Sequence, residues 1–125
     1  MSVAKAVVTI PDERYSWVAG NKYFVLGTVA IDASPATYAA GGLVMSLLAP
    51  LVKASRAPLF VSVVGQAGYI YRYVPGTDAS NGKLMIFEQS GVDDTPLDEY
   101  DDTVAIAAAV SGDTIVFEAL FHGQL

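Results

Sequence analysis

Short runs of β-branched and aromatic residues, separated by glycine, proline and small polar residues, make up most of this chain. Residues 3–10 and 23–31 are rich in Val, Ile, Thr, Tyr and Phe, a composition typical of strands, and residues 83–88 predict a further strand. Gly27 lies inside the second run and indicates a bulge or a close approach of another backbone. Residues 43–48 predict a further short strand or a turn before Pro50.

Turn sequences join several of these runs and predict hairpins. Residues 58–64 and 69–74 flank a four-residue loop with glycine at both ends, and a polar turn at 75–82 leads to the run at 83–88. Residues 103–110 and 114–121 flank Ser111, Gly112 and Asp113. Seven or eight strands with short turns predict one all-β domain over 1–125, a β-sandwich or jelly-roll-like antiparallel barrel, with 1–22 as an extended N-terminal segment.

In two of these runs, the alternation of side chains along a strand predicts which residues share a face. In the run at 69–74 one face carries a tyrosine ladder, Tyr69, Tyr71 and Tyr73. Aromatic faces stack on sugar rings, so the ladder is a candidate glycan platform, although cross-strand packing explains it as well. In the last run, Thr114, Val116, Glu118 and Leu120 share one face.

An uncharged loop at 34–42 interrupts the strands, and it contains Pro35 and the pair Gly41 and Gly42. Solvent-exposed loops are usually polar because their backbone groups must stay hydrated. We therefore expect this loop to lie against an apolar surface, either the core of its own chain or a partner.

The composition leaves little polar surface. Hydrophobic residues make up 53% of the chain and charged residues 16%, against about 25% charged in ordinary domains. A domain of this size cannot bury half of its residues, so the apolar excess is either exposed or covered by other subunits. The net charge of −6 repels phosphates, which argues against binding to nucleic acids and anionic membranes.

Targeting signals are not evident. The first ten residues are too short an apolar run for a signal peptide, and they are followed directly by Pro11 and Asp12. Residues 33–52 carry no charge, but Pro35, Gly41 and Pro50 would interrupt a membrane-spanning helix. We therefore expect no transmembrane segment, and we expect the chain to be made and assembled in the cytoplasm.

The residue types needed for catalysis are scarce. His122 is the single histidine, cysteine is absent, and no Gly-x-Ser-x-Gly turn occurs, so we expect neither an enzyme nor a bound cofactor. An acidic segment could offer oxygen ligands to calcium: Asp93, Asp94, Asp98, Glu99, Asp101 and Asp102. Its spacing lacks the alternate ligands and the central glycine of an EF-hand, so we expect a solvated rim and no metal site.

Four stretches together resemble a family. They are the loop at 34–42, the sequence Gly68-Tyr69-Ile70-Tyr71, residues 82–86, and the alanine-rich hairpin that ends at Phe121. Taken in this order, the chain after about residue 23 is similar to small structural proteins of tailed-bacteriophage virions, the head decoration or cement proteins. The resemblance rests on turn and strand residues. It implies a β-sandwich or jelly-roll-like protein that performs no reaction.

The resemblance also implies partners and a location. Such a protein would bind the assembled head at junctions between major capsid protein subunits, and would contact itself as a homodimer or homotrimer on the capsid surface. The interface residues expected on this basis are Trp17, Pro35, Thr37, Tyr38, Gly41, Gly42, Val44 and Met45. Trp17 could equally anchor the core. A tail or neck component and a carbohydrate-binding β-sandwich on a virion surface are the alternatives.

Overall fold

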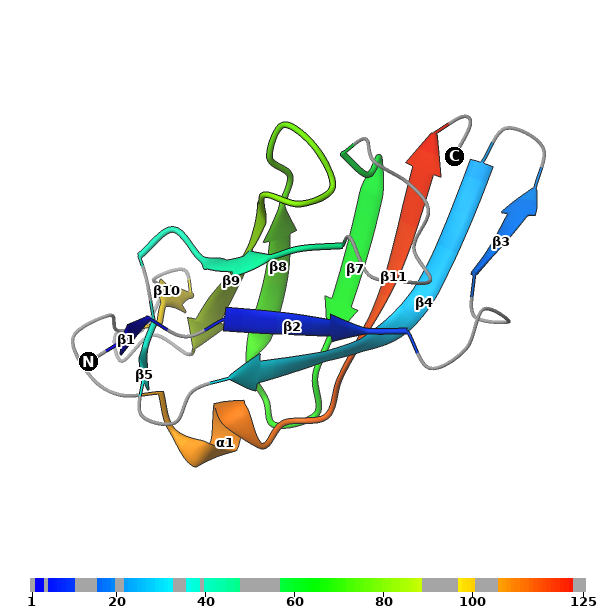
Figure 1. Cartoon of the computed structure of the whole chain (residues 1–125). Helices are drawn as coiled ribbons and strands as arrows, with labels where there is room; N and C mark the ends of the chain where they lie inside the picture. The colour runs from blue at the N-terminus through cyan, green and yellow to red at the C-terminus, as the bar shows by residue number, and fades with distance from the viewer. Residues whose placement is uncertain are drawn as a thin grey trace.

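The computed structural model describes residues 2–3, 5–10, 16–19, 22–32, 36–38, 40–47, 57–88, 97–100 and 106–122 (Figure 1). In the described residues nearly every element is a strand, which confirms the all-β prediction. The elements are β1 (Ser2–Val3), β2 (Lys5–Thr9), β3 (Ser16–Ala19), β4 (Lys22–Asp32), β5 (Ala36–Thr37), β6 (Leu43–Met45), β7 (Phe60–Val64), β8 (Ile70–Val74), β9 (Gly82–Glu88), β10 (Asp98–Glu99), α1 (Ala108–Ser111) and β11 (Ile115–His122).

One mixed sheet of nine strands forms a nearly closed barrel. Its strand order is β10-β9-β6-β2-β4-β11-β7, with β8 paired to β9 and β3 paired to β4. All its pairings are antiparallel except β2 with β6, and β1 and β5 form a separate parallel pair. β7 and β8 lie side by side without a ladder between them (Figure 1). The seam of the barrel, where its hydrogen bonding is interrupted, therefore lies between these two strands.

The longest strand, β4, carries a different partner on each half of one edge. It pairs with β3 near Lys22 and with β2 near Asp32, while β11 runs along its other edge. A Cβ atom on Gly27 would lie 2.5 Å from the carbonyl oxygen of Thr9 and 2.7 Å from Cε1 of Phe117. The close approach predicted at Gly27 is therefore confirmed, and the residues assigned to an N-terminal segment contribute two strands to the main sheet.

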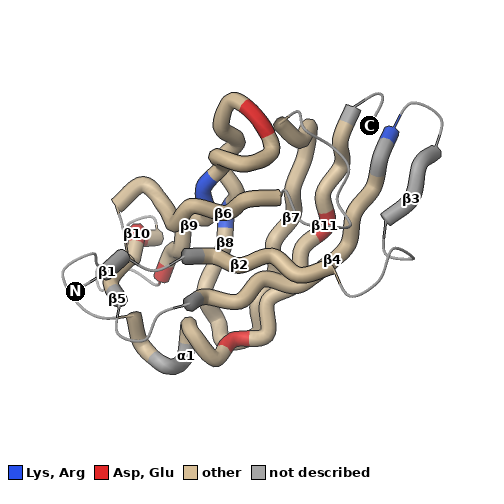
Figure 2. Tube along the Cα trace, in the orientation of Figure 1, with Lys and Arg blue, Asp and Glu red and all other residues tan. Residues whose placement is uncertain are grey.

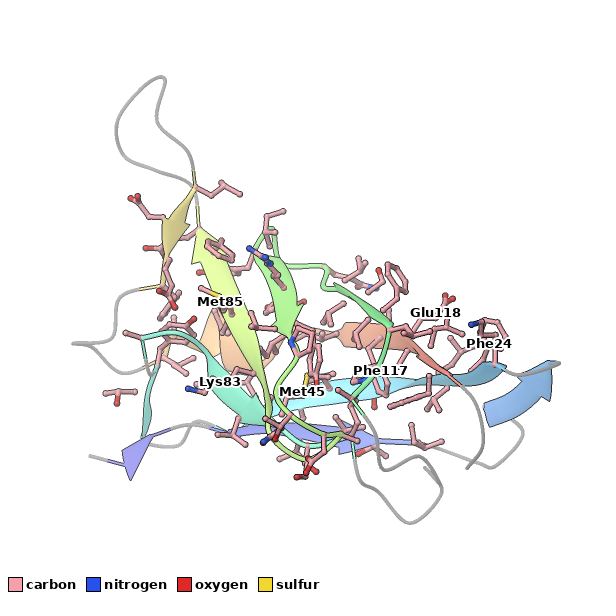
Figure 3. The ribbon with its side chains drawn as sticks, turned by 90° about the horizontal axis from the view of Figure 1, so that it is seen from above. Phe24, Met45, Lys83, Met85, Phe117 and Glu118 are labelled. Carbon is pink, nitrogen blue, oxygen red and sulfur yellow. The ribbon has the colours of Figure 1, made fainter. Side chains whose placement is uncertain are left out.

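The core lies inside the curled sheet. Alternate residues of β11 point inward and are buried, namely Ile115, Phe117, Ala119 and Phe121. The intervening side chains share one face, as predicted for 114–120, and the structure shows that this face is the outer one. Figure 3 shows Glu118 and Phe24 on one side of the sheet and Phe117 on the other.

The prediction of a β7–β8 hairpin is wrong. β7 pairs with β11, and β8 pairs with β9, with Ile70 opposite Phe87. The connecting loop turns toward Asp113, whose Oδ1 accepts hydrogen bonds from the amides of Gln66 and Ala67 at 2.8 and 3.0 Å. These hydrogen bonds hold the loop against the turn that precedes β11. β7 forms its ladder with β11.

The second predicted hairpin is also wrong in part. Residues 108–111 form α1, in which the amide of Ser111 donates to the carbonyl of Ala107 at 3.1 Å, and residues 103–105 lie outside the described part. Alanine favours helix over strand, which explains the difference. The β8–β9 hairpin is confirmed. Its polar turn is held by Asn81, whose Oδ1 accepts the amides of Thr77 and Asp78 at 2.9 and 3.1 Å.

Candidate interaction surface

The uncharged loop contacts the core of its own chain through Tyr38. Tyr38 is 1% exposed, and its hydroxyl donates to Oε2 of Glu99 at 2.6 Å while accepting from the amide of Ile86 at 3.2 Å. The amide of Gly41 donates to the same Glu99 oxygen at 2.7 Å. The ring of Tyr38 meets Tyr100 edge-on, with ring centroids 5.9 Å apart. Of the two expectations for this loop, contact with its own core is therefore correct at Tyr38.

Burial removes several residues from the expected interface. Tyr38, Gly42 and Met45 are buried in the barrel, so a partner cannot reach them. Thr37 is half-buried, whereas Gly41 and Val44 are exposed. Pro35 lies outside the described residues, and Trp17 belongs to β3, paired in register with Phe24.

The tyrosine ladder shares one face as predicted, but that face is the inner one. Tyr71 and Tyr73 are buried, and Tyr69 packs against the core with its ring centroid 6.0 Å from that of Tyr100. The hydroxyl of Tyr71 donates to Oδ2 of Asp113 at 2.7 Å. The hydroxyl of Tyr73 lies over Gly82, where it has no hydrogen-bond partner in the described structure. Inward-facing rings cannot stack on a sugar, so the glycan platform is wrong.

The buried tyrosines should make the fold sensitive to alkaline pH. Burial, together with hydrogen bonds to Glu99 and Asp113, raises the pKa of Tyr38 and Tyr71 above the ordinary value of 10.0. The unfolded chain releases these protons near pH 10, whereas the folded chain keeps them. The stabilisation is therefore complete below pH 10 and declines as the pH rises beyond it.

We expect the free energy of unfolding to fall by about 1 kcal/mol for each such tyrosine between pH 9 and pH 11. Urea denaturation at pH 8, 9, 10 and 11 measures this decline. Tyr71→Phe should be less stable at pH 8 but should show a shallower decline. If the free energy of unfolding of Tyr71→Phe declined with pH as steeply as that of the original protein, Tyr71 would not be a source of the alkaline sensitivity.

Exposed apolar side chains gather instead on the outside of β7 and β11. Four of the eight large hydrophobic residues that are exposed in the described part, Leu59, Phe60, Val64 and Val116, lie on or beside these two strands, and Ile70 lies across the seam. The ladders align Phe60 with Leu120 and Phe24, and Val64 with Val116. We call Phe60, Ser62, Val64, Val116, Glu118 and Leu120 the outer β7–β11 face.

This outer face carries almost no charge. Glu118 is its single ionisable residue, and Figure 2 shows the tubes of β7 and β11 otherwise free of acidic and basic positions where they are described. β3 is the next strand beyond β4, and its backbone register places Trp17 opposite Phe24. Neighbouring exposed apolar side chains of this kind make the outer β7–β11 face a candidate site of protein contact.

The acidic segment is described only in part. Asp98 and Glu99 form β10 beside β9, and the carboxylate of Glu99 accepts the hydrogen bond from the hydroxyl of Tyr38 in the uncharged loop. Residues 91–96 and 101–105 lie outside the described ranges. Within the described ranges no three acidic, histidine or cysteine side chains gather as metal ligands, and no helix is long and apolar enough to cross a bilayer. His122 ends β11, and its side chain lies outside the description.

Sequence reasoning missed the outer β7–β11 face as a site. The alternation in the last run placed Val116 and Leu120 on one face, but the pairing of β11 with β7 was not foreseen. Without that pairing, Phe60 and Val64 could not be placed beside them. No protein-family model, no curated protein and no solved structure matches this chain.

Proposed function

We propose that this chain is a non-catalytic structural protein that docks on a larger protein assembly through its outer β7–β11 face. The observation that carries the proposal is the cluster of half-exposed Phe60, Val64 and Val116 around one charged residue, Glu118. Each would bury apolar area on docking, worth about 25 cal/mol per Å² before the costs of association.

The assembly we propose is the shell of a tailed bacteriophage, with the major capsid protein and sister copies as partners. The support for this choice is the resemblance to head decoration proteins. A small domain with one modest apolar face binds such a shell by making contacts to several subunits at once, so that multivalency supplies strength. The protein would be made in the host cytoplasm and would end on the capsid surface.

Substitutions on two different faces test this proposal. Val64→Lys places a charge on the outer β7–β11 face, in the row that Val64 shares with Val116, and should weaken co-sedimentation with expanded shells of the parent phage at least tenfold. Val44→Lys is a matched control, because Val44 on β6 is 54% exposed and Val64 is 59% exposed. We expect the control to bind as the original protein does.

Two results would contradict the proposal: full binding by Val64→Lys, or loss of binding by Val44→Lys alone. Thermal unfolding of both variants checks that neither has lost its fold. Density on intact particles gives the location, because density at junctions between capsomers supports a decoration role, whereas density confined to the tail or neck supports the alternative.

A further inference from the structure

The polar turn between β8 and β9 ends in the dipeptide Asn81-Gly82, whose chemistry the proposed function does not use. The backbone nitrogen that follows an asparagine can attack its side-chain amide, and glycine permits this attack best because it has no side chain in the way. Asn81 is exposed, so water reaches it. The second asparagine of the chain, Asn21, precedes Lys22, whose side chain hinders the same attack.

The turn is built around the side chain of Asn81. Its Oδ1 accepts the amides of Thr77 and Asp78 at 2.9 and 3.1 Å, and its Nδ2 donates to Oγ1 of Thr77 at 2.6 Å. A Cβ atom on Gly76 would lie 2.7 Å from Cγ of Asn81, so the side-chain amide packs directly against that glycine. Aspartate accepts hydrogen bonds but has no group to donate, and glutamine is longer, so asparagine fits this turn.

The glycine at position 82 is also set by the fold. Gly82 begins β9 and pairs with Met45 of β6. A Cβ atom on Gly82 would collide with the hydroxyl of Tyr73 and would lie 2.7 Å from Cε1 of the same ring, which is buried. The packing of the turn therefore favours both residues of a chemically reactive pair.

We propose that Asn81 is a site of spontaneous deamidation and that the folded turn suppresses the reaction. The backbone nitrogen of Gly82 attacks Cγ of Asn81 and gives up its proton through water to Nδ2, which leaves as ammonia. Water then opens the resulting cyclic imide, either at Cγ to give aspartate or at the backbone carbonyl carbon to give isoaspartate. The modification goes beyond the proposed function and does not depend on binding to a shell.

The hydrogen bonds of the turn oppose the first step. The side-chain amide of Asn81 is directed toward Thr77 and Asp78, and it must leave them to meet the nitrogen of Gly82. Each hydrogen bond of ordinary strength slows this movement a few-fold, so three together slow it about tenfold or more. Packing of Tyr73 over Gly82 restrains the backbone on the other side of the reacting bond.

The two products should differ in their effect on the fold. Aspartate keeps the normal backbone and the acceptor for the two amides. Isoaspartate carries the main chain through Cβ and Cγ, which lengthens the backbone just before Gly82 and disturbs its pairing with Met45. A molecule whose turn has opened for long enough therefore carries a permanent change at the start of β9.

Deamidation rates in the folded and the denatured protein test this inference. Trypsin cleaves after Arg72 and Lys83, and in the peptide 73–83 Asn81 is the only amide side chain, so mass spectrometry follows that residue alone. We expect Asn81 to react about tenfold or more slowly in buffer than in guanidinium chloride at the same pH and temperature. In guanidinium chloride it should react faster than Asn21.

Two variants identify the restraint. Thr77→Val removes the acceptor of the Nδ2 hydrogen bond and keeps the backbone amide, so it should speed the reaction of Asn81 in buffer a few-fold and leave the rate in guanidinium chloride unchanged. Ser80→Ala is the matched control, because the hydroxyl of Ser80 donates to Asp78 in the same turn, and it should react as the original protein does.

Three results would overturn the inference: equal rates in buffer and in guanidinium chloride for the original protein, a rate in guanidinium chloride no higher than that of Asn21, or equal rates in buffer for Thr77→Val and Ser80→Ala. The first two comparisons use the original protein and stand even if a variant fails to fold. The isolated isoaspartate form should also unfold at a lower urea concentration than Asn81→Asp, and equal midpoints would contradict the backbone argument.

Discussion

Replacing Gly27 by alanine is expected to lower the free energy of unfolding by about 3 kcal/mol, the upper end of the usual cost of overpacking. The added methyl group would lie 2.5 Å from the carbonyl oxygen of Thr9 and 2.7 Å from Cδ1 of Ile10. A backbone oxygen inside a sheet cannot move aside as the end of a flexible side chain can. The strands β2 and β4 would therefore have to separate where their ladder ends.

Gly68→Ala is the matched control for Gly27→Ala. No atom lies within 4 Å of the Cβ position at Gly68, so the control tests backbone strain alone, because the φ of Gly68 is +95°. That strain costs about 1–2 kcal/mol. Urea denaturation measures both variants, and a loss at Gly27 no greater than the loss at Gly68 would contradict the packing argument.

Asp113→Ala is expected to cost about 3 kcal/mol, because charge-assisted hydrogen bonds contribute about 1.5–3 kcal/mol each and several are lost together. Its carboxylate accepts the hydroxyl of buried Tyr71 and the amides of Gln66 and Ala67. The two amides can turn to water, whereas the tyrosine hydroxyl cannot do so readily. Most of the loss should therefore arise at Tyr71.

A double-mutant cycle isolates that part. Asp113→Ala combined with Tyr71→Phe should cost less than the sum of the two single changes, with a coupling of about 1–2 kcal/mol. Asp113→Asn keeps one acceptor oxygen and should cost less than Asp113→Ala. Amide exchange at Gln66 and Ala67 should accelerate in the alanine variant. Strict additivity would show that Asp113 and Tyr71 act separately.

Most of the local strand pattern could be predicted from the sequence. β4, β9 and the β8–β9 hairpin were predicted from residue type and turn chemistry, because these signals act over a few neighbouring positions. Gly27 was foreseen for the same reason, as a residue without a side chain inside a run that otherwise packs.

The contacts between residues far apart in the sequence could not be predicted. The loop after β7 has the composition of a hairpin turn, yet Asp113, more than 40 residues away, binds its amides. Likewise an uncharged loop looks the same whether it covers a core or a partner, and the acceptor for Tyr38 is Glu99, 61 residues further along. The direction of the tyrosine face depends on which side the sheet curls toward, and the pattern of a single strand does not contain that information.

The position of β11 bears on how the chain reaches its native state. This strand, residues Ile115–His122, lies between β4 and β7, and its partners in β4 run from Val29 to Lys22, up to a hundred positions earlier. β7 can therefore join the sheet only after β11 has been synthesised, and contacts of such long sequence separation slow folding. Until then the apolar edges of β4 and β7 remain open to other nascent chains. We expect aggregation during rapid overexpression to arise at this stage and to ease when synthesis is slowed.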